Sequence, residues 1–268
     1  MTRQANEWDG ADASPIKYRR SRLSSFGDSL GKAPLSARIG LLVIALYVVM
    51  AIFAPVLAPF GEADVVSSEP FAAWSITHPF GTDQMGRDVL SRLIYGARNS
   101  VGIAFTTTAL AFVTGAGLGI FSAIASPRFD TVMSVIADTL MAIPQLIFAL
   151  ILLALFGSSI TSIVLIIAML NATQIFRLSR LLARNVVVME YIEAAYLRAE
   201  STWWIVTREI LPNVLPNLLA EFGLRFCFVF LTISALSFLG LGIQPPSADW
   251  GTMVRESATF ISYGNITP

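Results

Sequence analysis

The sequence predicts an all-α polytopic membrane protein. Hydrophobic residues make up 55% of the 268-residue chain and charged residues only 13%, whereas soluble domains carry about 25% charged residues. The apolar residues gather into five runs, each near the roughly 20 residues that a helix needs to cross a bilayer. Low charge and long apolar runs together exclude an ordinary soluble domain.

The five runs are the expected transmembrane helices. In chain order they cover residues 39–60, 101–125, 131–156, 160–176 and 222–243. The first run is preceded by 38 residues and is too long for the core of a signal peptide, so we interpret it as a retained span. In the third run, Pro144 is expected to kink the helix because an interior proline removes a backbone hydrogen bond.

The distribution of lysine and arginine predicts the orientation of the spans. Segment 1–38, the turn 126–130 and loop 177–217 together hold thirteen of these residues, whereas loop 61–100, the turn 157–159 and the tail 244–268 hold four. Cytoplasmic connections are enriched in lysine and arginine. We therefore expect a cytoplasmic N-terminal segment and a cytoplasmic loop 177–217, with loop 61–100 and the tail on the extracytoplasmic side.

Residue types that support enzymatic chemistry are scarce. His78 is the only histidine and Cys227 the only cysteine, so a histidine- or cysteine-rich metal site and a histidine-centred triad are not expected. The net charge of zero suggests no nucleic-acid partner. We find no nucleotide-binding motif and no convergent nucleophile and base, so the sequence predicts a protein that is not an enzyme.

Loop 177–217 is unusual because it carries helical pieces between two apolar runs. Glu190 and Glu193 stand near the start of one short helix, where the helix dipole favours acidic residues. Trp203, Val206 and Ile210 follow at i, i+3 and i+7 and form one apolar stripe. Pro212 and Pro216 are then expected to break or redirect the chain before the next span.

Two interpretations of this loop stay open on physical grounds. The first is an amphipathic element whose tryptophans lie in the headgroup region of the bilayer. The second is a docking helix, in which Ala194 and Ala195 allow close approach and Trp203 and Trp204 serve as interface anchors.

The sequence of this loop resembles a known motif. "EAA" at 193–195, a small residue at 199 and "ILP" at 210–212 are similar to the cytoplasmic loop of bacterial ABC-importer permeases, which forms a coupling helix that fits a cleft in the ATP-hydrolysing subunit. The resemblance implies ATPase-coupling roles for a set of residues that consists of Glu193, Ala194, Ala195, Ala199, Trp203, Ile210, Leu211 and Pro212. The family's glycine is Ala199 here. Because alanine lacks easy access to positive φ, we expect a different bend or weaker coupling.

Two further stretches resemble the dipeptide/oligopeptide/nickel branch of these permeases, and specifically its second permease subunit. One is "HPFGTDQMGRDVLSRLIYGARNS" at 78–100 and the other is "ALSFLGLGIQPPSADWGTMV" at 235–254. The first contains the loop motif Gly81, Thr82, Asp83, Gly86, Arg87 and Asp88. These charged residues either brace the loop over the pore or contact a soluble receptor. Residues 87–100 are expected to form an amphipathic helix at the membrane surface.

The resemblance implies the partners and the working of the protein. These are a second homologous permease subunit, two ATPase subunits that use ATP and Mg, an extracytoplasmic solute-binding protein and the lipid of the bacterial inner membrane, with no cofactor bound by this chain. The solute is expected to be a peptide or a similar small molecule. Dipeptides, longer peptides, opine-like compounds and chelated nickel all stay open. The family usually has six spans, so we expect a chain truncated before a sixth helix.

For several intramembrane residues, more than one interpretation stays open. Gly115 and Gly119 form a GxxxG pair that permits close helix packing, either within this subunit or at a subunit interface. Asp138 is expected to pair with Arg177 or Arg180. The alternative function, an ATP-independent secondary transporter or channel, would use Asp138 as its ion or proton site.

Overall fold

The computed structural model describes residues 34–261, and all of the regular elements within them are helical. In chain order they are α2 (Leu35–Leu57), α3 (Val89–Ile124), α4 (Pro127–Met141), α5 (Gln145–Phe156), α6 (Ile160–Val187), α7 (Glu190–Leu197), α8 (Thr202–Ile205), the π-helical turn η1 (Val206–Ile210), α9 (Leu211–Phe238) and α10 (Trp250–Ile261).

Among the described residues, four helices are long and apolar enough to cross a membrane, or five if the bent pair α4–α5 counts as one span. The predicted all-α polytopic class is therefore confirmed. Most of the predicted cytoplasmic segment 1–38 and the last residues of the predicted tail, 262–268, lie outside the described residues.

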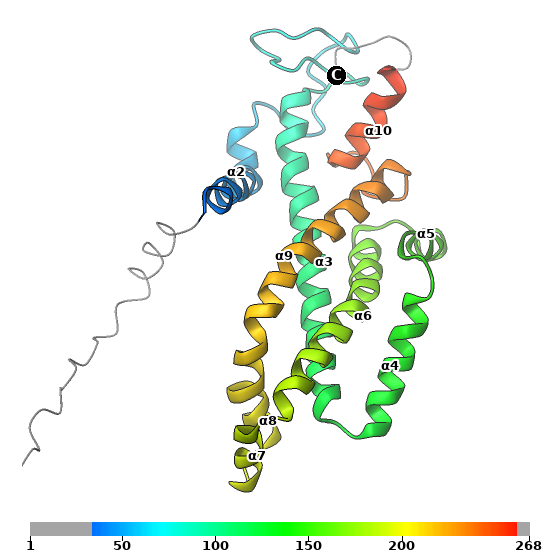
Figure 1. The fold of residues 1–268 in the computed structure, drawn as a ribbon. Coiled ribbons are helices and arrows are strands. Elements are labelled where there is room, and N and C mark those ends of the chain that lie inside the picture. The colour runs from blue at the N-terminus through cyan, green and yellow to red at the C-terminus, as the bar shows by residue number, and fades with distance from the viewer. Residues whose placement is uncertain (1–33, 262–268) are drawn as a thin grey trace, which may run out of the picture. The chain divides into compact units, whose positions relative to one another are not determined.

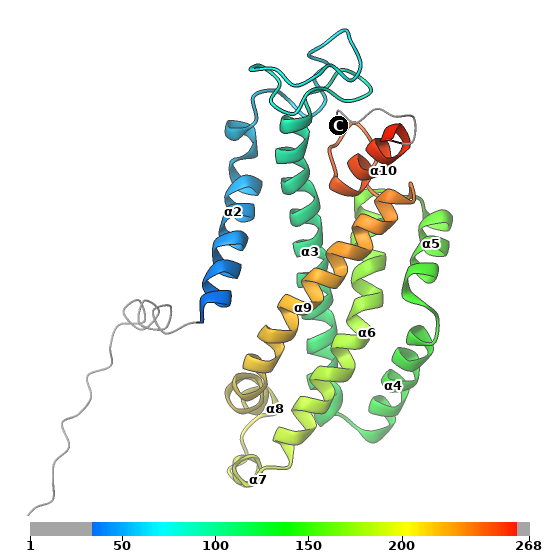
Figure 2. The same ribbon diagram turned by 45° about the horizontal axis from the view of Figure 1, so that its top comes forward.

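The chain divides into two compact units, Met1–Leu46 and Tyr47–Pro268. The described part of the first unit is the opening of α2. In the second unit, α3, α6 and α9 lie side by side (Figures 1 and 2). The helices α7 and α8 lie at one end of this group, and α10 and the loop 58–88 lie at the other. The two motif-bearing loops are therefore at opposite ends of the three helices.

The contact between α3 and α6 is the most extensive in the protein, and glycines make it close. A Cβ atom added at Gly115 would lie 2.5 Å from the carbonyl oxygen of Ala172 on α6. A Cβ atom added at Gly119 would lie 2.5 Å from the carbonyl oxygen of Phe176 and 2.0 Å from the hydroxyl of Ser179. Both glycines of the GxxxG pair thus face a helix of the same chain.

The segment 87–100 differs from the separate surface helix that its apolar stripe predicts. It is the opening of α3, which continues without a break to Ile124. Burial does not follow the stripe, because the polar residues Ser91, Arg92 and Ser100 are buried together with Ile94 and Ala97. The loop before α3 and α10 contact the polar side of this segment through Asp83, Asp249 and Glu256, whereas Leu93 of the apolar stripe is exposed.

The third predicted span is broken rather than kinked. Helices α4 and α5 are bent by 89° at the break between them, which contains residues 142–144. Pro144 is the N-cap residue of α5, so its missing N–H falls where no helical hydrogen bond is required. The fourth predicted span, in turn, is longer than its apolar run, since α6 extends through the charged residues Arg177, Arg180 and Arg184 to Val187.

The prolines expected to break the chain before the fifth span lie inside a helix instead. Pro212 lies at the start of α9, directly after the π-helical turn η1, and Pro216 lies inside the same helix, within a helical stretch that is continuous from Thr202 to Phe238. The predicted tail contains a further helix, α10. The indole of Trp250 donates a hydrogen bond to the carbonyl of Leu93 on α3, at 3.0 Å.

We expect the substitution Gly119→Ala to destabilise the protein by about 1–3 kcal/mol, because the added methyl group would overpack a backbone contact that has no room for it. The matched control is Gly117→Ala on the same helix, where an added Cβ meets nothing within 4 Å. This control should be neutral or slightly stabilising, since alanine is the better helix former. Thermal unfolding of the two variants in detergent measures the difference. Equal midpoints would contradict the close packing.

Candidate functional site

The loop between α6 and α9 is a compact unit built on a small apolar core. Ile192 and Ala195 of α7 are fully buried and pack in one cluster with Ala183 of α6 and with Ile205 and Ile210 further along the loop. Met189 is the N-cap residue that separates α6 from α7. The loop is also tied to α9, because the side chain of Asn213 donates a hydrogen bond to the hydroxyl of Tyr191 at 3.2 Å. Helix α7 is therefore held firmly against the end of α6.

The end of α7 shows how the chain bends with alanine in place of glycine. Ala199 has φ +57°, in the left-handed region that glycine enters without strain. The amide of Glu200 donates to the carbonyl of Ala195 at 3.2 Å, and the amide of Ala199 donates to the carbonyl of Tyr196 at 2.9 Å. These two bonds form a Schellman motif. Ala199 adopts this left-handed conformation at a cost of about 1–2 kcal/mol, so alanine at this position does not prevent a turn with positive φ.

The predicted coupling residues fall into two groups. Ala195 and Ile210 are buried and form the core of the loop, and Leu211 is half-buried. The exposed group consists of Glu193, Ala194, Ala199, Trp203 and Pro212. The indole of Trp203 is 75% exposed, although its backbone is fixed by Ser201, whose hydroxyl accepts a hydrogen bond from the amide of Trp204 at 3.2 Å.

Further apolar side chains lie exposed on the same loop. Leu197, at the end of α7, is 83% exposed, and Val188 and Met189 are exposed just before α7 begins. A rigid backbone thus presents aliphatic and aromatic side chains beside charged ones. Such a surface, formed by an aromatic anchor and a polar rim, is typical of a protein interface.

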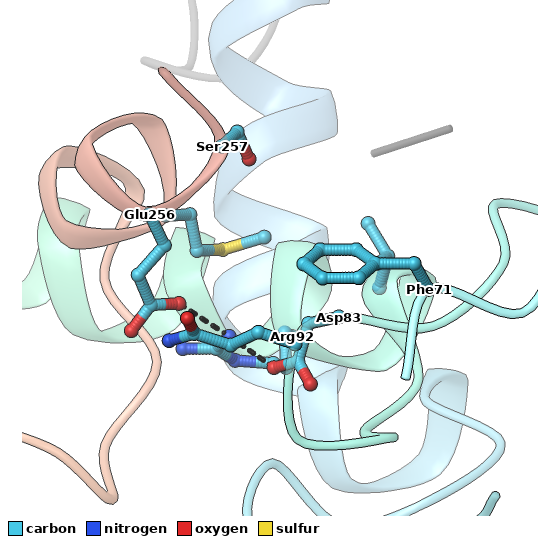
Figure 3. Close-up of a pocket in the computed structure, with 8 residues that line it drawn as sticks. Phe71, Asp83, Arg92, Glu256 and Ser257 are labelled. Carbon is cyan, nitrogen blue, oxygen red and sulfur yellow. Dashed lines mark hydrogen bonds and ion pairs between the residues drawn. The ribbon is translucent and has the colours of Figure 1, made fainter. Parts of the chain in front are cut away.

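At the other end of the bundle, the motif of loop 58–88 forms a buried ionic network, part of which Figure 3 shows. Asp83 accepts from the Nε of Arg87 at 2.7 Å and from the Nη1 of Arg92 at 2.5 Å. The same Nη1 lies 2.8 Å from the Oε2 of Glu256 on α10. Both guanidinium groups are almost fully buried. Two cations face two anions, so the network is neutral and joins the loop to α3 and α10.

The remaining motif residues shape the loop around this network. Asp88 caps α3 by accepting from the amide of Ser91 at 2.8 Å, and its other oxygen lies 3.1 Å from the Nδ1 of His78. Thr82 is buried, and its hydroxyl accepts from the amide of Ala72 at 2.8 Å. Gly81 and Gly86 both have positive φ, and an added Cβ at either would meet a carbonyl oxygen within 2.5 Å. The charged residues of the motif point inward and brace the loop.

Two further ion pairs lie on the membrane segments. The carboxylate of Asp138 lies 3.5 Å from the Nη1 of Arg177, and both side chains are more than half exposed. Glu221 and Arg225, four residues apart on α9, form an ion pair at 2.5 Å. Within residues 34–261, no group of three histidine, cysteine or acidic residues could hold a metal ion.

One ionic cluster is absent from the sequence predictions. Asp130, at the start of α4, binds Arg180 and Arg184 of α6 and the hydroxyl of Ser122 of α3. In the sequence, Asp130 stands in a short turn beside an apolar run, where an exposed acid at a helix start is ordinary. The only signal for a buried partner is the spacing of three basic residues along the last part of α6.

Comparison with known proteins shows the family. Residues 115–266 match the family described as binding-protein-dependent transport system inner membrane component, and residues 36–71 match the N-terminal transmembrane domain of oligopeptide transport permease C. The chain therefore belongs to the permease family of binding-protein-dependent ABC transport systems.

Curated relatives agree over most of the chain. The dipeptide transport system permease protein DppC of Alkalihalophilus pseudofirmus is 34% identical over 225 residues, which cover 84% of this chain and 74% of the relative. The di/tripeptide transport system permease protein DppC of Pseudomonas aeruginosa is 32% identical, over 83% of this chain and 75% of the relative. The probable D,D-dipeptide transport system permease protein DdpC of Escherichia coli is 33% identical, over 82% and 74%.

We expect Ala199→Gly to stabilise the loop by about 1 kcal/mol, because glycine relieves the left-handed strain at the end of α7. Hydrogen exchange of the amides of residues 190–200 should slow by about fivefold. The matched control, Ala194→Gly in the interior of the same helix, should accelerate exchange, since glycine weakens a helix interior. Faster exchange in Ala199→Gly would show that the strain is absent.

We expect Asp83→Asn to destabilise the protein by about 3–5 kcal/mol, because it leaves two buried guanidinium groups with only Glu256 as an anionic partner. Protease cleavage within loop 58–88 should become faster. The control Asp64→Asn removes an acid of the same loop whose carboxylate accepts only a local, exposed hydrogen bond from Gly61. Similar cleavage rates in both variants would contradict the bracing role.

Proposed function

We propose that this chain is the permease subunit of an ATP-driven importer of peptides or similar small solutes, and that α7 and α8 dock it onto a separate ATPase subunit. The observation that carries the proposal is the exposed aromatic and aliphatic surface of this loop, supported on a buried core within a member of a binding-protein-dependent transport family. The two DppC relatives are named for the transport of dipeptides and of di- and tripeptides.

The proposed assembly contains two unlike permease subunits, two ATPase subunits and an extracytoplasmic solute-binding protein. The chain lies in the bacterial inner membrane with its N-terminus in the cytoplasm. The lysine and arginine count supports this orientation, and so does the placement of the candidate docking loop and the braced loop 58–88 at opposite ends of the helices.

The coupling mechanism is mechanical, and the chain itself performs no covalent chemistry. Closure of the ATPase pair around ATP displaces α7, which is packed against the end of α6 through Ile192 and Ala183. Because α6 is one continuous helix, the displacement reaches the membrane segments and changes the access of the solute path. ATP and Mg bind to the ATPase subunits.

We expect Trp203→Ala and Glu193→Arg to weaken capture of the ATPase subunits and to uncouple uptake from ATP hydrolysis. Loss of a buried aromatic interface anchor costs about 2 kcal/mol or more, which is roughly a thirtyfold loss of affinity. The measurement is co-purification of the ATPase from gently solubilised membranes, together with uptake of a labelled dipeptide. The control for capture is Trp74→Ala, because Trp74 is similarly exposed but lies on loop 58–88 at the opposite end.

Normal capture of the ATPase subunits and normal uptake of the dipeptide with both substitutions would contradict the docking role of the loop. Uptake that survives ATP depletion but collapses with the ion gradient would instead favour the alternative, a secondary transporter that uses Asp138. The exposed ion pair between Asp138 and Arg177 gives that alternative no closed ion site.

A further inference from the structure

Asp130 ties three helices together at the end of the bundle that carries α7. Its Oδ1 accepts a hydrogen bond from the hydroxyl of Ser122 on α3 at 2.7 Å. Its Oδ2 accepts from the Nη2 of Arg180 and from the Nη2 of Arg184, both on α6 and both at 2.5 Å. The side chain of Asp130 is only 8% exposed. One buried carboxylate therefore binds a buried serine and two arginines, of which Arg180 is partly exposed and Arg184 half exposed.

Elsewhere α4 is held loosely. Beyond the ionic cluster, a largely apolar hollow of about 350 Å³ lies between α3, α4 and α6, lined on α4 by Met133, Ala137 and Leu140. Within the described residues, the only other polar contacts between α4 and α6 are the exposed ones that Arg177 makes with Asp138 and Met141. Exposed ion pairs contribute about 0–1 kcal/mol. Asp130 is thus the strongest polar attachment of α4 to its neighbour.

The other end of α4 adjoins a sharp break in the chain, which is a candidate hinge. Helix α4 ends at Met141, and the 89° break that follows contains residues 142–144. A short segment next to a proline is a common place for a hinge, since few residues need to change φ and ψ. In contrast, α3 and α6 are continuous over 36 and 28 residues. Helix α4 is therefore bounded by the break at residues 142–144 at one end and is attached to α6 through Asp130 at the other.

The tie lies directly beside the candidate docking loop. Arg184 is less than one turn from the end of α6 at Val187, and its neighbour Ala183 packs in the same cluster as Ile192 of α7. A displacement of α7 that moves the end of α6 consequently acts on Arg180 and Arg184. A paired arginine and carboxylate transmit such a movement well because their two-point geometry is rigid.

We propose that Asp130 is a positioning residue through which α6 carries the displacement of α7 to α4, so that α4 swings about the break at residues 142–144 when the ATPase closes. This inference rests on the proposed function, because it takes α7 to be the element that the ATPase moves. It identifies α4 as the element that moves and the carboxylate of Asp130 as the group that transmits the movement.

The first test measures coupling in the complete transporter, reconstituted with its partner permease, ATPase subunits and binding protein. The ratio of labelled dipeptide taken up to ATP hydrolysed should fall tenfold or more in Asp130→Asn, while ATP hydrolysis continues. Asp130→Glu, which retains the carboxylate, should recover most of the ratio. The matched control is Asp138→Asn, on the same helix with an exposed arginine partner, and its ratio should stay within twofold of the unmodified chain.

The second test follows α4 directly. Spin labels are placed on exposed residues in a Cys227→Ser background, one pair at Val135 of α4 and Val113 of α3, and another at Tyr196 of α7 and Val113. Electron–electron distances are measured without nucleotide and with a non-hydrolysable ATP analogue. In the unmodified sequence both pairs should shift. In Asp130→Asn the α7 pair should still shift while the α4 pair no longer does.

The outcomes separate the two hypotheses. If the α7 pair does not respond to nucleotide in the unmodified chain, the proposed function fails. If α7 responds and Asp130→Asn still moves α4 and couples normally, the role of Asp130 is overturned while the proposed function stands. Should Asp130→Asn fail to assemble, Arg184→Gln removes one arginine and retains Arg180; it should lower the coupling ratio about threefold, and an unchanged ratio would equally overturn the role of Asp130.

Discussion

The close approach of α3 and α6 at Gly115 and Gly119 is the contact on which the rest of the structure depends. Within a bilayer, helices gain little from burying apolar surface because lipid is as apolar as their side chains, so association depends on close packing. The two glycines let the backbones of α3 and α6 touch. Since α6 carries both the base of α7 and the arginines that bind Asp130, its position against α3 sets the geometry of the end of the bundle at which α7 lies.

Charged residues then act at the two ends of this helix pair rather than along it. One end holds Asp83, Arg87, Arg92 and Glu256, and the other holds Asp130 with Arg180 and Arg184. Buried charges are costly unless every charge has a close partner. Both clusters meet that condition by joining elements that are far apart in sequence, and each consequently fixes the relative positions of the helices it joins.

The loop motif combines two physical tasks in one short stretch. Ile192 and Ala195, three residues apart on α7, point inward to the core of the loop, whereas Glu193 and Ala194 between them face outward. The Schellman turn at Ala199 directs the chain from α7 to α8 and thereby sets where Trp203 is exposed. A residue change that is harmless to the core can therefore still alter the docking surface, because the same turn positions both.

The sequence by itself determined the class of the protein and the order of its apolar segments, because a helix that crosses a bilayer must be long and apolar wherever it packs. It also located Glu193 and Trp203, since a charged and aromatic stretch between apolar runs is visible without any structure. The sequence did not determine where the helices begin and end. The segment 177–187, with its arginines, is the last part of α6, and the segment 87–100 leads into and opens α3, because neighbouring elements bury polar residues of both.

Only the tertiary structure decided which charges meet. Nothing in the sequence pairs Asp130 with Arg180, fifty residues away, or Arg92 with Glu256. Nor could the sequence show that Ala199 would accept a left-handed conformation, since the strain is local but the packing of Ile192 and Ala195 that compensates for it is not. Local patterns fix what each segment can be, whereas the pairing of buried charges and the bends that position them are properties of the packed helices.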